Sequence, residues 1–308
     1  MKSKDPLLNS MEIKKIIKQS NLDTTETELL IAHILKKPRE FILAHPEQEI
    51  TKAKKQKIIK NIKERSKGVP IAYLTGHKEF FGLDFLVNKN VLIPRPDTEL
   101  MVELALQELR IKNQESRIVL IDIGTGSGCI PISILKTLNK FPPRLPAEMV
   151  GGGTRGVLAF AIDISSLALT TARKNAKLHK TKIKFLHGDL LEPIIKNFEI
   201  LKFQNFKIII TANLPYLTPK QFKQEPSIQH EPKLALVAGN DGLKYYRQLL
   251  KQISQLSKSY NLKPISYFEI DPSQTSSIKK LIKKILPQAK IEIKKDLTGL
   301  DRVVIIKI

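Results

Sequence analysis

Residues 119–135, "VLIDIGTGSGCIPISIL", join a run of bulky apolar residues to a glycine-rich loop and a second apolar stretch. The first run has the composition of a strand that is buried on both faces of a sheet. Gly124, Gly126 and Gly128 allow the backbone to turn sharply and to approach a ligand closely. This stretch therefore predicts a buried strand, a ligand-binding loop and an apolar helix in succession.

The same alternation continues to the C-terminus. Seven strand-like runs follow residue 116, and helical stretches separate the first six. Strands that alternate with helices predict a mainly parallel, doubly wound α/β sheet. The last two runs are separated by a few residues around "DLTGLD", too few for a crossover helix, so we expect an antiparallel hairpin at the sheet edge. Seven strands with a final reversed pair are the arrangement of Rossmann-like methyltransferases. The runs span residues 117–124, 157–163, 182–189, 206–213, 264–270, 289–295 and 302–308.

The glycine spacing bears on the ligand. It is G-x-G-x-G rather than the dinucleotide G-x-G-x-x-G, and with Asp122 before the loop it favours S-adenosylmethionine over NAD. A plain glycine turn after a strand remains the alternative. Asp163, at the end of the second strand, is the candidate acceptor for the adenosine ribose. At the end of the third strand, Asp189 could accept from the adenine amino group and Leu190 could pack on the ring.

Asp163 lies 35 residues beyond Gly128, whereas about 20 is usual for such a pair. The proline- and glycine-rich residues 141–156 account for the excess, and we interpret them as an inserted surface loop. The three glycines within it resemble no phosphate loop, because neither a preceding strand nor the required lysine is present.

The N-terminal part of the chain has a different hydrophobic pattern. Residues 1–70 show helical periodicity at 11–20, 24–37 and 50–68, with capping threonines at the start of the second segment and no strand-like alternation. They predict a small all-helical domain. Residues 71–100 contain an "NKN" turn and the proline-rich "IPRPDTE", which suggest a hairpin and a connector to a catalytic domain over 101–308. The connector is either a rigid linker or part of a ligand cleft, and we do not expect Arg95 or Asp97 to be catalytic.

Composition limits the class of protein. The net charge of +22 invites a nucleic-acid interpretation, but only 10 of the 52 basic residues are arginine, and lysine is spread along the whole chain. Weak attraction to RNA or the ribosome is compatible with this charge. A lone cysteine, the lack of a long apolar run and a polar N-terminus predict a cytoplasmic protein without disulfides or membrane segments. Six scattered histidines predict no metal site.

Several motifs together carry a resemblance to a known family. In chain order they are "FFGLDFLVNKNVLIPRPDTELMVE", "LIDIGTGSGCI", "AIDIS", "GDLLEP", "ANLPY", "EPKLALVAGNDGLKYYRQLL" and "KKDLTGLDRVVI". In this combination they resemble the HemK-type (PrmC-like) glutamine methyltransferases, which act on peptide chain release factors. The resemblance runs from about residue 29 to the C-terminus.

The resemblance implies a substrate, a cofactor and a set of contacts. The substrate is the glutamine of a Gly-Gly-Gln motif in a release factor, methylated on its side-chain amide nitrogen with S-adenosylmethionine, and the N-terminal helical domain helps to recognise the release factor. A monomer is expected. The family often has a larger aromatic residue at the position of Leu190. The implied cofactor contacts are Gly124, Thr125, Gly126, Ser127, Gly128, Asp163, Leu190 and Asn213, and the positions of Asp122 and Asp189 at strand ends add those two to the predicted set.

The implied catalytic and substrate-binding residues are Asn213, Leu214, Pro215 and Tyr216, where the family has Asn-Pro-Pro-Tyr. An amide nitrogen is a poor nucleophile, so two acceptors that hold its NH₂ group in line with the methyl group are the chemical need. Asn213 could supply its side-chain oxygen and residue 214 its backbone carbonyl, while Tyr216 packs on the amide. Pro215 keeps residue 214 extended, so leucine can fill a backbone role there.

Three alternatives share these motifs. A ribosomal-protein glutamine methyltransferase would have the same catalytic residues. An adenine N(6) methyltransferase of DNA or RNA would use a related motif, because an exocyclic amino group presents the same chemical problem. A noncatalytic cofactor-binding protein would result if Leu214 had disabled the site.

Overall fold

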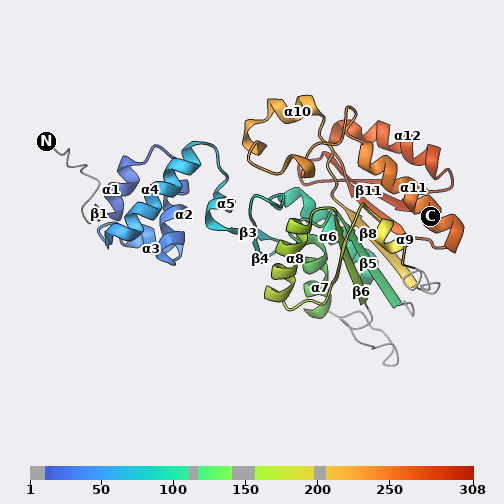
Figure 1. Ribbon diagram of the computed structural model, residues 1–308, viewed down its shortest axis with the longest axis horizontal. Coiled ribbons are helices and arrows are strands. Elements are labelled where there is room, and N and C mark those ends of the chain that lie inside the picture. Colours follow the sequence, from blue (N-terminus) through green and yellow to red (C-terminus); the bar gives the residue numbers. More distant parts are fainter. Residues whose placement is uncertain (1–10, 111–116, 141–156, 198–205) are drawn as a thin grey trace. The chain divides into compact units, whose positions relative to one another are not determined.

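The computed structural model describes residues 11–110, 117–140, 157–197 and 206–308 (Figure 1). These divide into two compact units, one ending at His77 and the other beginning at Lys78. The predicted inserted loop, residues 141–156, lies outside the described residues. No helix in the described ranges is both long enough and apolar enough to cross a membrane.

The N-terminal unit is built from short helices around one apolar core. Isoleucines from three of them, Ile13, Ile16, Ile31 and Ile58, are buried together. The three predicted helices are present, and two further short ones, α3 and α5, follow α2 and α4. The helices are α1 (Ile13–Gln19), α2 (Thr24–Leu35), α3 (Arg39–Ala44), α4 (Lys52–Ser66) and α5 (Ile71–Thr75).

Two local expectations for this unit were wrong. Helix α2 is capped by Asp23, whose carboxylate accepts from the backbone N–H groups of Thr25 and Glu26, so the threonines lie inside the helix. A carboxylate at this position also interacts favourably with the helix dipole. In addition, the two-residue strands β1 (Met11–Glu12) and β2 (Glu49–Ile50) pair with each other. They are too short to produce the alternation by which a strand is recognised in a sequence.

A two-stranded sheet opens the second unit. It turns at Phe81 and Gly82, which both have positive φ, of 53° and 68°. The "NKN" turn follows this sheet instead of forming its reversal, and there the Asn90 N–H donates to Asn88 Oδ1 over 2.9 Å. A 3₁₀ turn over Pro96–Thr98 then leads into the first α-helix of the second unit. The strands are β3 (His77–Phe80) and β4 (Leu83–Leu86).

The core of the second unit is a seven-stranded sheet in the order β10-β11-β9-β8-β5-β6-β7. The pairs among β5, β6, β7, β8 and β9 are parallel, whereas β11 is antiparallel to both β9 and β10. The predicted fold class and the terminal antiparallel hairpin at the edge are confirmed. The strands are β5 (Arg117–Ile123), β6 (Val157–Asp163), β7 (Lys184–His187), β8 (Phe206–Ala212), β9 (Ile265–Glu269), β10 (Lys290–Lys295) and β11 (Asp301–Lys307).

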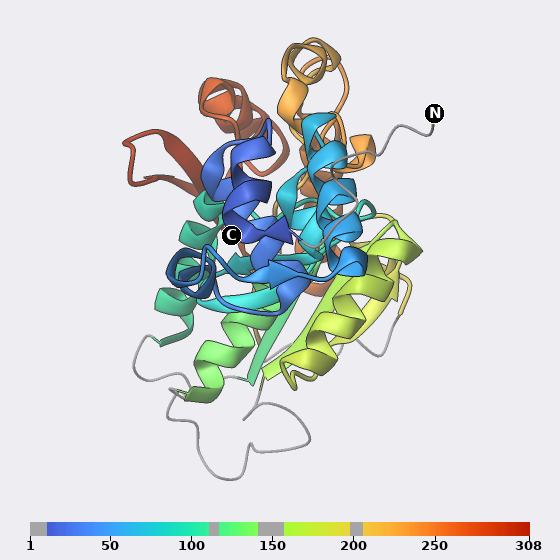
Figure 2. The same ribbon diagram turned by 90° about the vertical axis from the view of Figure 1, so that its left-hand side faces the viewer.

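Helices cover both faces of this sheet, which explains why its strands are apolar throughout. Ile118 and Leu120 of β5 pack with α6 and α7, whereas Val119 and Ile121 point to the other face and pack with α11 and α12. Figure 2 shows α8 running alongside the parallel strands. The helices are α6 (Glu99–Arg110), α7 (Cys129–Lys140), α8 (Ser166–Leu178), α9 (Glu192–Ile195), α10 (Pro219–Gln224), α11 (Lys244–Tyr260) and α12 (Thr275–Ile285).

Candidate active site

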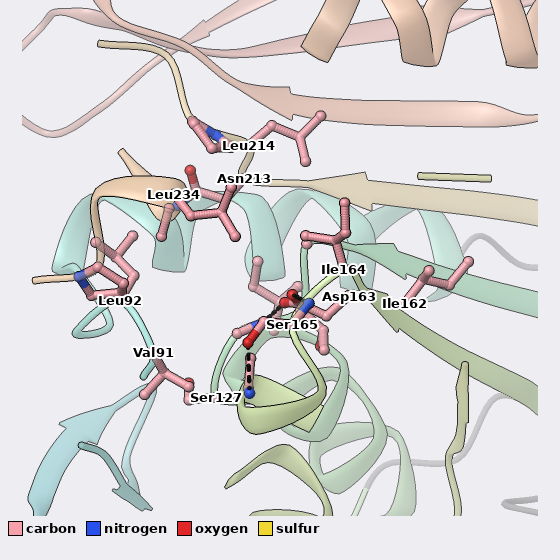
Figure 3. A pocket seen from close by; sticks show the side chains of 18 of the residues that line it. Val91, Leu92, Ser127, Ile162, Asp163, Ile164, Ser165, Asn213, Leu214 and Leu234 are labelled. Carbon is pink, nitrogen blue, oxygen red and sulfur yellow. Dashed lines mark hydrogen bonds between the residues drawn. The ribbon is translucent and has the colours of Figure 1, made fainter. Parts of the chain in front are cut away.

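A cavity lies beyond the carboxyl ends of the parallel strands. Strand β5 pairs with β6 on one side and with β8 on the other, so the strand order reverses at β5: β6 and β7 follow on one side, and β8 and β9 on the other. Such a switch point opens a crevice in an α/β sheet. The cavity is lined by the segments after β5, β6, β7 and β8 and by residues from two loops, 90–95 and 232–235. Figure 3 shows Asp163, Asn213 and Leu214 among the side chains that line it.

The glycine loop after β5 is held by its neighbouring strand. The N–H groups of Gly124 and Thr125 both donate to the carbonyl of Ile162, over 2.9 and 3.0 Å. Gly124, Gly126 and Gly128 all have positive φ, of 68°, 56° and 81°, a region in which a side chain is strained. The loop therefore needs glycine at all three positions.

Gly128 serves the packing of helices and does not line the cavity. A Cβ atom there would lie 3.1 Å from Ile132 Cδ1 and 3.3 Å from Ala172 Cβ, which brings α7 and α8 close together. Gly124 is also crowded, because its Cβ would lie 3.0 Å from Leu214 Cδ2. The loop and the turn after β8 are thus in direct contact.

Asp163 connects this loop to α8. Its carboxylate accepts from the Gly126 N–H over 2.9 Å and from the Ser165 N–H over 2.8 Å, one bond at each oxygen. Burial raises the pKa of Asp163, and these backbone donors oppose that rise. Each carboxylate oxygen has a further lone pair, so the side chain can still accept from a ligand hydroxyl.

Asp122 is placed behind the loop and does not line the cavity. One oxygen accepts from the Thr211 hydroxyl over 2.6 Å, and the other is buried without a partner in the described chain. Burial raises the pKa of Asp122 to about 7, and the hydroxyls of Thr125 and Thr211 act against this rise. Asp122 therefore supports the end of β5 and does not form part of the cavity wall.

Two buried hydroxyls in the loop lack partners. Within the described ranges, Thr125 Oγ1 and Ser127 Oγ make no hydrogen bond of normal geometry, although Thr125 lies close enough to Asp122 to lower the pKa of that carboxyl, and both residues line the cavity. Buried polar groups are normally paired, so these hydroxyls are suited to a polar ligand. Asp189 and Leu190 also line the cavity, and Asp189 Oδ2 accepts from Gln248 Nε2 over 2.6 Å.

The turn after β8 divides its four residues between the cavity and the protein interior. Asn213, Leu214 and Pro215 line the cavity, and Asn213 Nδ2 donates to Thr98 Oγ1 over 3.0 Å. Leu214 is buried, with its N–H 3.3 Å from the Tyr246 hydroxyl. Tyr216 is not among the lining residues, and its hydroxyl lies 3.4 Å from Glu269 Oε1. Burial raises the pKa of Tyr216 above its usual value, so this hydroxyl stays protonated.

Comparisons with known proteins extend these observations. Residues 11–76 match the family model described as the PrmC N-terminal domain. The chain is 31% identical over 290 residues to the release factor glutamine methyltransferase of Bacillus cereus, covering 94% of both chains. It is 32% identical over 311 residues to the same-named protein of Clostridium acetobutylicum, covering 99% of this chain and 98% of that one. Identity at this level along both whole chains decides the family.

The chain belongs to the release factor glutamine methyltransferase family. The predicted resemblance is confirmed, and the protein is a methyltransferase by descent. Among solved structures, the hMettl16 catalytic domain in complex with MAT2A 3'UTR hairpin 1 aligns with a TM-score of 0.53 at 14% identity, covering 90% of both chains. That likeness is one of fold alone.

Several residues that support the site of this glutamine methyltransferase family member were not predicted from the sequence. Asn175 of α8 donates to the Ser127 carbonyl over 2.8 Å and thereby supports the glycine loop. Glu231 accepts from the Ile93 N–H over 3.0 Å and pairs with Arg95, which ties the connector to the cavity rim. Thr98 contacts Asn213 directly. Each lies far in sequence from its partner, so no local pattern indicates the contact.

Proposed function

We propose that the protein methylates the side-chain amide nitrogen of the glutamine in the Gly-Gly-Gln motif of peptide chain release factors, with S-adenosylmethionine as the methyl donor. The observation that carries the proposal is the likeness along the whole chain to release factor glutamine methyltransferases. The turn at residues 213–216 supports it, because it presents an amide acceptor at the wall of the cavity.

The residues around the cavity fit this cofactor. Asp163 retains acceptor capacity for a ribose hydroxyl, and the hydroxyls of Thr125 and Ser127 are buried without partners in the described residues. The glycine loop leaves room for close approach of a ligand to its backbone. When bound, S-adenosylmethionine supplies a methyl group that is already activated by a positively charged sulfur.

The task left to the protein is to orient the substrate nitrogen. Asn213 Oδ1 is available as an acceptor for one hydrogen of the substrate NH₂ group, because Nδ2 of the same amide is directed to Thr98. The Leu214 carbonyl serves as the second acceptor in this proposal. Two acceptors on the NH₂ group also favour the positive charge that develops on nitrogen during transfer. One proton on the nitrogen becomes acidic as the methyl group arrives and passes to water, so no ionised base is needed beforehand.

The proposal is tested by locating the transferred methyl group. The protein is incubated with isotope-labelled S-adenosylmethionine and a release factor, and the label is mapped by mass spectrometry. We expect it on the glutamine of the Gly-Gly-Gln motif. Asn213→Ala should reduce the rate by at least about a hundredfold, the usual effect of removing a group that stabilises developing charge.

The exposed Asn197 provides a matched control for the loss of an asparagine side chain, and Asn197→Ala should leave the rate unchanged. Ribosomal proteins and unmethylated nucleic acid are tested in parallel. Label on a ribosomal protein alone, or on adenine alone, contradicts the proposal in favour of one of the related activities.

A further inference from the structure

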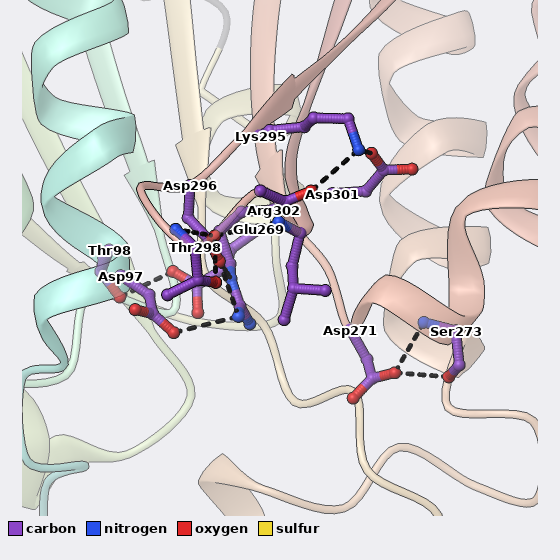
Figure 4. Close-up of polar contacts among 12 residues, drawn as sticks. Asp97, Thr98, Glu269, Asp271, Ser273, Lys295, Asp296, Thr298, Asp301 and Arg302 are labelled. Carbon is purple, nitrogen blue, oxygen red and sulfur yellow. Dashed lines mark hydrogen bonds and ion pairs between the residues drawn. The ribbon is translucent and has the colours of Figure 1, made fainter.

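Thr98 lies at the end of the proline-rich connector and is 2% exposed. Its hydroxyl contacts two side chains from distant parts of the chain. It donates to Glu269 Oε2 over 2.6 Å, and it accepts from Asn213 Nδ2 over 3.0 Å. Glu269, the last residue of β9, is 1% exposed. Figure 4 shows the contact between Thr98 and Glu269. A buried polar chain therefore runs from the cavity wall into the protein interior.

The chemistry of these groups gives the chain a direction. An ionised carboxylate can only accept, so the single hydroxyl hydrogen of Thr98 is committed to Glu269. Thr98 Oγ1 can then only accept from Asn213, which must offer its NH₂ group. The Asn213 amide is thereby held with Nδ2 toward Thr98 and Oδ1 away from it. Across the described residues, Asn213 Oδ1 makes no hydrogen bond.

Charged and titratable groups surround Glu269. Burial raises the pKa of Glu269 to about 7, while the Thr98 hydrogen bond and the nearby Arg302 lower it and Asp97 raises it. Arg302 lies 3.1 Å from Asp97 and 3.0 Å from Asp296. Figure 4 draws these residues around Glu269. The hydroxyls of Tyr216 and Tyr246 also approach, at the Glu269 carboxylate and backbone carbonyl respectively.

We propose that Thr98 is a positioning residue for methyl transfer and that, anchored by Glu269, it fixes the Asn213 amide with its oxygen directed to the substrate. The inference rests on the proposed function, since it assigns Asn213 Oδ1 the role of acceptor for the substrate NH₂ group. It gives the connector a part in the reaction beyond that of a rigid linker.

The first test compares two substitutions of Thr98. Thr98→Val keeps the shape but removes the hydroxyl, so the amide can rotate and present its NH₂ group to the substrate. We expect kcat to fall by about ten- to a hundredfold, below the full effect of removing a stabilising group. The KM for S-adenosylmethionine should be unchanged. Thr98→Ser restores the hydroxyl and should restore kcat to within about threefold, because the hydrogen bonds it can make are the same.

The second test uses pH. Below the pKa of Glu269 the protonated carboxyl can donate to Thr98, whose hydroxyl then donates to Asn213 and reverses the amide. Thus kcat should fall as pH drops through about 7. Glu269→Gln removes the titrating group without a large change in shape and should abolish this fall. If Thr98→Val does not fold, the comparison of the pH dependence of kcat between the wild type and Glu269→Gln tests the positioning role instead.

The outcomes separate the two proposals. If the wild-type protein does not methylate the glutamine of a release factor, the proposed function itself fails. If it does, and Thr98→Val has wild-type kcat or Thr98→Ser is as impaired as Thr98→Val, the positioning role is overturned. A fall in kcat near pH 7 that persists unchanged in Glu269→Gln overturns the part assigned to Glu269.

Discussion

At the scale of single residues, the turn after β8 separates side-chain roles from backbone roles. Asn213 is held by Thr98, whereas Leu214 is held through its N–H and through apolar contact with the glycine loop. The leucine side chain is buried in the core, a contribution that its sequence context did not indicate. Its proposed part in the reaction remains that of its backbone carbonyl.

Leu214→Pro tests this division of roles. Proline removes the N–H that contacts Tyr246, but that hydroxyl keeps its bond to the Glu269 carbonyl. A neutral hydrogen bond contributes about 1 kcal/mol, so we expect kcat to fall by no more than about tenfold. Steady-state kinetics with a release factor measure the effect. A fall of about a hundredfold or more would argue against a backbone role for residue 214.

At the scale of elements, the glycine loop positions α7 and α8 as well as a ligand. Gly128 combines a positive φ with close contacts to both helices. Gly299, in the turn between β10 and β11, has a similar φ of 85° but nothing within 4 Å of its would-be Cβ. The two glycines therefore share backbone strain and differ in packing.

We predict that Gly128→Ala is more destabilising than Gly299→Ala. Both substitutions bear the cost of a left-handed conformation, about 1–2 kcal/mol. Only the first forces Ile132 and Ala172 apart, which adds about 1–3 kcal/mol to the loss in free energy of unfolding. Urea denaturation of both variants measures the difference. Equal losses would show that α7 and α8 accommodate the extra methyl group.

At the scale of the whole molecule, the chain consists of two units with separate cores. The isoleucine core of the N-terminal unit is confined to residues 11–62, and the clusters on the two sheet faces lie within residues 80–308. Every residue that lines the cavity comes from the second unit. The role of the first unit in recognising a release factor is a prediction from the family resemblance.

A fragment of residues 78–308 tests this role. Because its core and cavity are its own, we expect it to fold and to bind S-adenosylmethionine within about threefold of the full chain. It should methylate a short Gly-Gly-Gln peptide with unchanged KM. Its KM for a complete release factor should rise by at least about tenfold, because a second contact that raises the effective concentration is lost. An unchanged KM for the complete factor would exclude recognition by the N-terminal unit.

Much of the fold could be predicted from local patterns. Each strand-like run corresponds to an observed strand within a few residues, because apolar runs bounded by turns are a property of neighbouring residues. The loop glycines could be identified because their spacing is likewise a pattern among neighbouring residues. The cap of α2 was misassigned because Asp23 and the threonines are all good capping residues, and only the backbone geometry distinguishes them.

The sequence alone determined the family, the α/β fold and the turn that carries Asn213, since all three reside in contiguous motifs. The tertiary structure alone decided that Thr98 contacts both Asn213 and Glu269, although 115 and 171 residues respectively separate it from them. It also decided that neither Asp122 nor Tyr216 forms part of the cavity wall. Hydrogen bonds between distant elements depend on how the strands and helices pack together. This packing cannot be recognised from the spacing of residues in the sequence.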